Sequence, residues 1–98
     1  MESYTNEHIK NMIAPVAMRF GVKRAWLFGS YARGESGDKS DIDIRIEKGE
    51  IRSLIQLIAF RQALETVMRV PVDVITSDIA DTEFLTSIRK DEILLYER

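Results

Sequence analysis

Two aspartates stand two residues apart in a segment of strictly alternating polarity, 41–47 (D-I-D-I-R-I-E). Because side chains alternate between the faces of a β-strand, Asp41 and Asp43 project from one face. Neighbouring carboxylates repel each other, and a divalent cation is the usual partner that removes the repulsion. Asp73 lies in a second apolar segment, 70–76, where an unpaired carboxylate would be costly. If the two segments are neighbouring strands, the three aspartates form a set of oxygen ligands suited to Mg²⁺ or Mn²⁺.

The turn before this segment adds a second chemical feature. Segment 22–28 (V-K-R-A-W-L-F) is rich in β-formers and stops at Gly29, which predicts a strand running into a tight turn. A helix starting after Ser30 would direct backbone N–H groups and the Ser30 hydroxyl to the sheet edge, where they favour a phosphate. Gly29 allows a close approach of the backbone that a Cβ would hinder. The alternative role of Ser30 is that of an ordinary helix N-cap.

Apolar periodicity predicts the elements that would position these residues. Helices are predicted at 5–20, 51–69 and 82–90, with a short one after Ser30, and strands at 22–28, 41–47 and 70–76. Pro15 could kink or split the first helix. The apolar arc of the second long helix comprises Leu54, Leu57, Ile58, Leu64, Val67 and Met68. Segment 93–96 predicts an apolar tail or edge strand, and the order of elements predicts an α/β (mixed α+β) fold, with a small mixed sheet backed by helices.

Length and composition narrow the classes of protein. The 98 residues, 45% hydrophobic and 31% charged, predict one folded domain over 1–98 without a separate acceptor-binding domain. With no cysteine and the single His8, a metal site would consist mainly of carboxylates. The polar N-terminus and the lack of a long apolar run predict a cytoplasmic protein without membrane association. A net charge of −2 gives no general attraction to nucleic acid, so stable nucleic-acid binding is not expected.

The glycine-serine turn and the paired aspartates together resemble a known family. The string G-S-Y-A-R-G-E-S-G-D-K-S-D-I-D, with ten residues between Ser30 and Asp41, is similar to the G-S-x₁₀-D-x-D signature of polymerase-β-like nucleotidyltransferases. G-S-x-A-R-G-E with S-D-I-D more closely resembles the minimal nucleotidyltransferases, the MntA-type antitoxins of HEPN/MNT toxin–antitoxin systems. The resemblance spans nearly the whole chain, since the long helix and the late Asp73 also fall in family order.

This resemblance implies a polymerase-β-like nucleotidyltransferase fold and an enzyme that transfers AMP from ATP with two Mg²⁺ ions. It implies that Gly29 and Ser30 hold the β- and γ-phosphates and that Asp41 and Asp43 bind the metals. Asp73 corresponds to the third catalytic carboxylate, which helps bind the second metal and activates the attacking hydroxyl. The implied acceptor is a tyrosine hydroxyl of a cognate HEPN RNase toxin, whose activity is thereby blocked.

Further candidates surround this set. Arg33 could neutralise triphosphate charge and Ser40 could donate to a phosphate, although an exposed helix arginine and a turn cap explain them equally well. Arg45, on the carboxylate face, could order the carboxylates or reach the acceptor. Tyr31 could contact the nucleotide, and Glu92 is expected at a solvated helix end.

Two other functions are compatible with these residues. The chain could be a non-catalytic antitoxin that neutralises its partner by steric occlusion, with a vestigial nucleotide site. It could also be a nucleotidyltransferase that acts on a small molecule or an RNA end. The presence of all three aspartates favours catalysis over occlusion, and the expected lack of an acceptor domain favours a partner protein as the acceptor.

Overall fold

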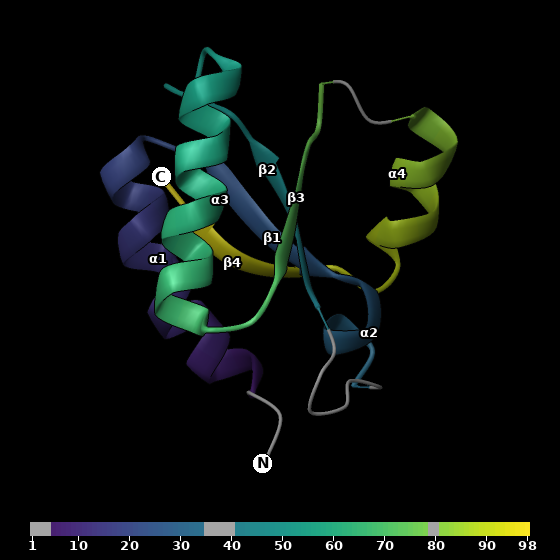
Figure 1. Ribbon diagram of the computed structural model, residues 1–98. Coiled ribbons are helices and arrows are strands. Elements are labelled where there is room, and N and C mark those ends of the chain that lie inside the picture. Colours follow the sequence, from purple (N-terminus) through teal and green to yellow (C-terminus); the bar gives the residue numbers. More distant parts are fainter. Residues whose placement is uncertain (1–4, 35–40, 79–80) are drawn as a thin grey trace.

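The computed structural model describes residues 5–34, 41–78 and 81–98 and contains one four-stranded sheet (Figure 1). The elements are α1 (Asn6–Phe20), β1 (Arg24–Phe28), α2 (Gly29–Ala32), β2 (Ile42–Glu47), α3 (Leu54–Met68), β3 (Val72–Thr76), α4 (Thr82–Arg89) and β4 (Ile93–Glu97). The strand order is β3-β2-β1-β4. β2 is parallel to β3, and β1 is antiparallel to both β2 and β4. The predicted mixed sheet backed by helices is therefore confirmed, and segment 93–96 lies in an edge strand.

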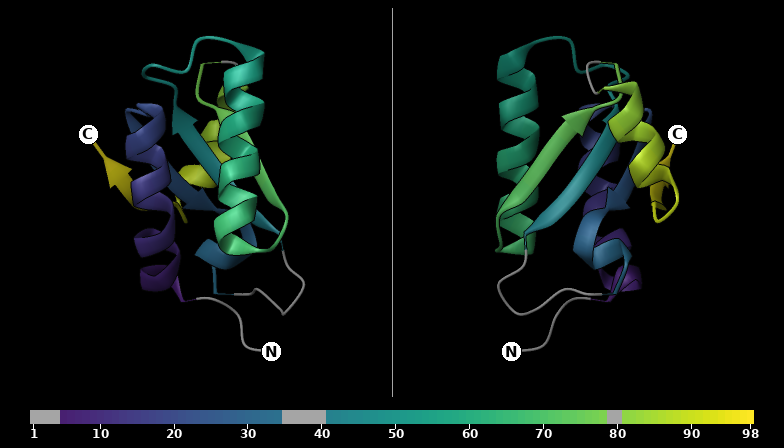
Figure 2. Two further views of the ribbon diagram at one scale, coloured as in Figure 1. Left: turned by 60° about the vertical axis from the view of Figure 1, so that its left-hand side comes forward. Right: turned by 90° about the vertical axis from the view of Figure 1, so that its right-hand side faces the viewer.

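The two faces of the sheet differ in what covers them. α1 and α3 lie side by side on one face, as the two views of Figure 2 show. The isoleucines of β2, Ile42, Ile44 and Ile46, are fully buried beneath these helices. α4 lies on the opposite face and contributes no buried residue. The alternation of β2 thus places its isoleucines in the core and its charged residues on the more open face.

α1 is one continuous helix, so the predicted split at Pro15 does not occur. The Thr5 side chain caps its start by accepting a hydrogen bond from the His8 N–H at 3.1 Å, and Gly21 ends it in the left-handed region at φ +72°. Pro15 is exposed. The carbonyl that loses its donor belongs to Asn11, which is also exposed and accessible to water.

The predicted apolar arc of α3 is partly wrong. The residues that α3 buries are Phe60, Leu64 and Met68. Leu54 and Ile58, both in the predicted arc, are 70% and 41% exposed. The first turns of α3 read L-I-Q-L-I-A-F, and so many apolar positions around the helix leave the buried side undetermined by periodicity. Within the residues described, no helix is long and apolar enough to span a membrane.

Candidate functional site

Two of the predicted catalytic aspartates lie next to each other at one end of the open face. In the parallel pairing of β2 and β3, Asp43 is directly aligned with Asp73. Side chains aligned in this way project from the same face of the sheet. Asp41 stands one residue before β2 and two before Asp43. The strand carrying the late aspartate therefore lies beside the D-x-D strand, and the fold gathers the three residues at one end of the sheet.

The raised pKa of the Asp43 carboxyl reflects the crowding of negative charge at this end of the sheet. Partial burial, followed by the negative charges of Asp73 and Asp41, raises the pKa of Asp43 to about 6. A hydrogen bond with Asp73 acts in the same direction, and only the positive charge of Arg33 opposes these effects. A carboxyl group with such surroundings gains from any cation that reaches it.

The Gly29-Ser30 turn touches this cluster directly. Phe28 at the end of β1 is aligned with Asp43, so the turn begins beside that residue. Gly29 has φ +76°, in the left-handed region that glycine adopts readily. A Cβ at this position would lie 2.3 Å from Oδ2 of Asp43. Both conformation and space therefore require glycine at this position. The close approach of the Gly29 backbone to a phosphate, which the sequence predicts, stays a prediction.

α2 differs from the predicted helix in its start and its length. It begins at Gly29, before Ser30, and is one turn of four residues. Phe28 is the N-cap, so Ser30 does not have the alternative capping role. A single turn has little macrodipole, which leaves backbone N–H groups and the Ser30 hydroxyl as the groups that could hold a phosphate. Tyr31 is 3% exposed and belongs to the core, so its predicted contact with a nucleotide is wrong.

The donor set at this end of the sheet fits a hard divalent cation in type. Among the residues that the structure describes, no three acidic or histidine side chains lie close enough to enclose a metal ion. Asp43 and Asp73 are nevertheless adjacent, and Asp41 is exposed and can change rotamer without disturbing the core. Oxygen-only ligands suit Mg²⁺ or Mn²⁺. Ser40, a predicted phosphate-binding residue, lies outside the described residues.

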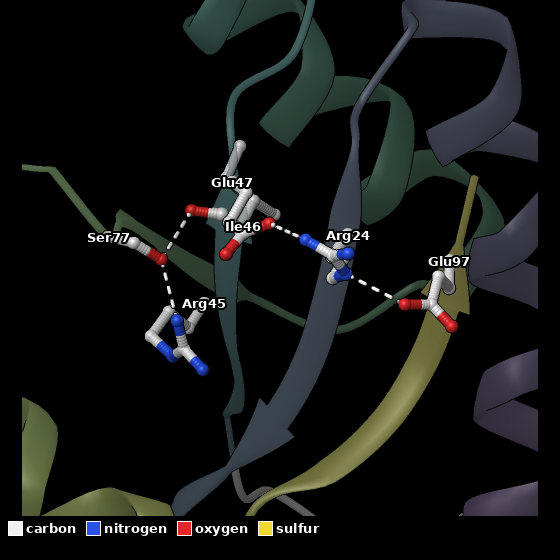
Figure 3. Close-up of polar contacts among 6 residues, drawn as sticks. All are labelled: Arg24, Arg45, Ile46, Glu47, Ser77 and Glu97. Atoms are coloured by element: carbon white, nitrogen blue, oxygen red, sulfur yellow. Dashed lines mark hydrogen bonds and ion pairs between the residues drawn. The ribbon is translucent and has the colours of Figure 1, made fainter.

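Arg45 serves neither of the roles predicted for it. It is 4% exposed, and its guanidinium lies over the ring of Trp26 at 3.8 Å. Nε and Nη2 donate to the two carboxylate oxygens of Glu92, with Nη2 and Oε1 2.8 Å apart. Nη1 donates to Oγ of Ser77 at 2.6 Å (Figure 3). Each of the three guanidinium nitrogens of Arg45 thus donates a hydrogen bond within the protein.

Glu92 is the polar residue that the sequence interpretation missed. Its side chain is 7% exposed, which contradicts the expected solvated helix end. Periodicity places Arg45 on the open face but gives no indication of a partner 47 positions later in the chain. Glu92 balances the charge of Arg45, and the cation that lowers the pKa of Asp43 is Arg33.

At the far end of the same face, the charged side chains also form ion pairs. Arg24 on β1 is aligned with Glu47 on β2 and with Glu97 on β4. Its Nη1 donates to Oε1 of Glu47 at 2.6 Å, and its Nε donates to Oε2 of Glu97 at 2.8 Å (Figure 3). Unbalanced negative charge among the described residues of β2 is therefore concentrated at Asp43.

The sequence matches a family model and curated relatives. The model described as "Polymerase beta, Nucleotidyltransferase" matches residues 9–98. A "Putative protein adenylyltransferase" of Methanocaldococcus jannaschii is 50% identical over 68 residues, which cover 69% of this chain and 73% of that protein. The protein adenylyltransferase MntA of Thermococcus cleftensis is 37% identical over 75 residues, which cover 76% of this chain and 72% of that protein.

The fold also matches solved structures. A structure described as a "putative minimal nucleotidyltransferase" superposes with a TM-score of 0.79 at 25% identity, covering 95% of this chain and 98% of that one. The structure of a tri-AMPylated Shewanella oneidensis HEPN toxin in complex with MNT antitoxin contains a chain that matches with a TM-score of 0.74 at 20% identity. That match covers 96% of this chain and 74% of the other, and it concerns the fold.

Proposed function

Because this chain belongs to the polymerase beta nucleotidyltransferase family, we propose that it transfers AMP from ATP to a tyrosine hydroxyl of a cognate HEPN RNase toxin and so acts as an antitoxin. The observation that carries this proposal is the alignment of Asp43 with Asp73, with Gly29 packed against Asp43. The names of the protein adenylyltransferase relatives support AMP as the transferred group. The fold shared with a complex of a HEPN toxin and MNT antitoxin supports the partner class.

In this proposal the turn at the end of β1 holds the triphosphate. Backbone N–H groups at Gly29 and the Ser30 hydroxyl donate to the β- and γ-phosphates. Arg33, whose charge already reaches Asp43, adds positive charge beside the phosphates. Ser40, directly before Asp41, donates a further hydrogen bond to a phosphate. The backbone donors of the turn have positions set by the fold, so they need little reorganisation when ATP binds.

The three aspartates hold the cations in this proposal. Asp41 and Asp43, together with Asp73, would bind two Mg²⁺ ions, or Mn²⁺ in their place. When bound, the ions offset the repulsion among the carboxylates, lower the pKa of the attacking hydroxyl and stabilise the leaving pyrophosphate. Asp43 is partly buried within the sheet, whereas Asp73 is exposed on the edge strand β3. Asp73 is therefore accessible to an acceptor that is carried on another protein.

The transfer itself is an in-line displacement at the α-phosphorus. The tyrosine oxygen forms a bond to the α-phosphorus while the bond from that phosphorus to the bridging oxygen of the β-phosphate breaks. Asp73 accepts the hydroxyl proton, and pyrophosphate leaves with the electron pair of the broken bond. The product is a tyrosine joined to AMP through a phosphodiester.

Labelled nucleotide tests the proposal. The chain is incubated with ATP labelled on the α-phosphate, Mg²⁺ and its cognate HEPN protein. We expect label on the partner, located at a tyrosine by peptide mass spectrometry, and none with the variant Asp41→Asn/Asp43→Asn. Absence of label on the partner, with both proteins folded, would refute the transfer to a HEPN toxin.

The same double variant separates catalysis from steric occlusion. We expect it to bind the partner and to leave its RNase activity intact, because the modification no longer occurs. If the double variant neutralises the toxin as well as the parent chain does, occlusion is the mechanism and transfer is not. Removing Mg²⁺ with a chelator should have the same effect as the double substitution.

A further inference from the structure

The connection between β3 and β4 crosses the open face of the sheet. These strands occupy opposite edges, and α4, which lies between them in sequence, is on the face opposite α1 and α3 (Figures 1 and 2). None of the residues of α4 is fully buried, although Leu85 and Ile88 are half-buried. Specific contacts at the two ends of the crossover therefore contribute to its position.

Arg45 contacts both ends of this crossover. Ser77 directly follows β3, and Glu92 directly precedes β4. Nη1 of Arg45 donates to Oγ of Ser77 at 2.6 Å, while its Nε and Nη2 donate to the carboxylate of Glu92. The Ser77 hydroxyl in turn donates to the Ile46 carbonyl at 3.0 Å, which ties the same point to β2 (Figure 3). One guanidinium therefore fixes where the crossover leaves the sheet and where it returns.

The chemistry of this contact calls for arginine. The side chains of Arg45 and Glu92 are 5% and 7% exposed, so loss of either partner leaves a buried, uncompensated charge. The planar guanidinium engages both oxygens of one carboxylate and also stacks on Trp26. A lysine ammonium can do neither in that geometry.

The crossover also touches the strand end beside the candidate site. Phe84 of α4 meets Phe28 edge-on, with ring centroids 5.9 Å apart and planes at 86°. Phe28 directly precedes Gly29 and is aligned with Asp43. A displacement of α4 would therefore be transmitted to the residue from which the phosphate-holding turn begins.

We propose that Arg45 is a positioning residue, which clamps both ends of the α4 crossover so that α4 forms a fixed wall beside the Gly29-Ser30 turn and orients bound ATP. Arg45 itself touches neither the nucleotide nor the acceptor. The inference rests on the proposed nucleotide-transfer function for its effect on ATP, but the clamp itself does not depend on it.

ATP affinity is the first measurement. Equilibrium binding of ATP with Mg²⁺ is compared between the full chain and Arg45→Met, without any acceptor. We expect the Kd to rise about 10- to 100-fold, as is usual when a supporting contact of a site is lost. A merely structural role would lower the fraction of binding-competent protein and leave the Kd of that fraction unchanged.

Arg24→Met is the matched control. It removes an arginine that makes two ion pairs on the same face, with Glu47 and Glu97, but none to the α4 crossover. We expect its Kd for ATP to stay within about twofold of the parent value, because changes away from the site rarely affect binding. Ser77→Ala releases one end of the crossover and keeps the buried ion pair of Arg45 and Glu92 intact. It is therefore the variant to measure if Arg45→Met does not fold. Its Kd should rise by a smaller factor.

Amide hydrogen exchange of α4 tests the clamp without nucleotide. We expect exchange across 82–89 to be faster in Arg45→Met and Ser77→Ala than in the parent chain, and unchanged in Arg24→Met. Equal α4 exchange in the parent and in both clamp variants overturns the clamp. An ATP Kd that is the same in Arg45→Met as in the parent chain overturns the proposed effect of the clamp on ATP binding. If the parent chain binds no ATP, the proposed transfer function fails instead, and the exchange result still decides the clamp.

Discussion

The two ends of β2 carry the same alternating pattern but opposite electrostatic arrangements. At one end Asp43 lies beside Asp73 and near Asp41, and its pKa is raised to about 6. Two and four residues further along the same face, Arg45 is paired with Glu92 and Glu47 is paired with Arg24. Charge on a strand face is therefore not informative by itself. We propose that a carboxylate without a cationic partner among the described residues, such as Asp43, serves to bind a cation, whereas a paired carboxylate serves the structure.

The two arrangements of charge on β2 also differ in their effect on the stability of the fold. Stability alone would favour a neutral side chain at Asp43, because burial and two nearby negative charges disfavour its ionised form. The paired charges of Arg45 and Arg24 instead connect strands or loops that are distant in sequence. The unpaired end is suited to an external cation, and the paired region is suited to holding the surrounding elements in place.

The largest expected effect comes from neutralising the unpaired end. Asp43→Asn keeps the size of the side chain but removes the charge that would bind a cation, and we expect AMP transfer to fall on the order of a thousandfold. Glu47→Gln, four residues away on the same strand face, should change the rate by only about twofold, in line with the small worth of partly exposed ion pairs. Initial rates of label transfer to the partner measure both. Equal losses of transfer rate in the two variants would contradict the proposed difference between the two ends of β2.

Alanine substitutions at two glycines distinguish the effect of a steric clash with Asp43 from the effect of backbone strain. Gly29 and Gly34 have φ of +76° and +74°, but a Cβ on Gly29 would lie 2.3 Å from Asp43, whereas a Cβ on Gly34 would meet no atom of the described residues within 4 Å. Both alanine variants should lose about 1 kcal/mol of unfolding free energy through backbone strain. Only Gly29→Ala should also lose activity, by about 100-fold, because it displaces the Asp43 carboxylate. Chemical denaturation and transfer rates distinguish the outcomes, and similar activity losses would mean that conformation alone matters.

The smallest expected effect is a gain in stability on removing the crowded charge. Folded Asp43 keeps its proton up to a pH of about 6, whereas an unfolded aspartate releases it near 3.8. The unfolded state therefore binds fewer protons in this window, and the unfolding free energy falls as pH rises from about 4 to about 6. Without divalent cations, Asp43→Asn should be more stable than the parent chain at pH 7 by about 1 kcal/mol, after allowance for solvent screening.

Denaturation curves across this pH range check that sign. The difference in unfolding free energy between Asp43→Asn and the parent chain should shrink as the pH falls and approach zero well below pH 3.8, where Asp43 is neutral in both the folded and the unfolded state. Glu47→Gln provides the control, since removal of a paired carboxylate should not stabilise the protein at any pH. A parent chain that is more stable than Asp43→Asn at pH 7 without divalent cations would contradict the electrostatic account.

Local sequence features predicted the fold and the aspartate end of the sheet well. Strict alternation placed Asp43 on the open face, and the glycine at the end of segment 22–28 predicted the tight turn that Gly29 makes at φ +76°. These features succeed because strand periodicity and backbone conformation are determined within a few residues. The family match and the order of the strands confirm the fold class.

Features that depend on distant partners were not predictable in the same way. Glu92 is buried because Arg45, far away in sequence, meets it across the sheet. α3 has apolar residues on several sides, so only its packing against α1 decides that Phe60 is buried while Leu54 is exposed. Tertiary contact, which local propensity does not encode, determined each of these outcomes.

The titration of the Asp43 carboxyl tests the central claim most directly. Its carboxyl ¹³C shift can be followed by NMR against pH, first without divalent cations and then with Mg²⁺ and ATP. We predict a pKa of about 6 in the cation-free protein and a pKa well below that value when Mg²⁺ and ATP are present. A pKa near 3.8 in the cation-free protein, or one that Mg²⁺ and ATP do not change, would contradict the assignment of this end of the sheet as a cation-dependent nucleotide site.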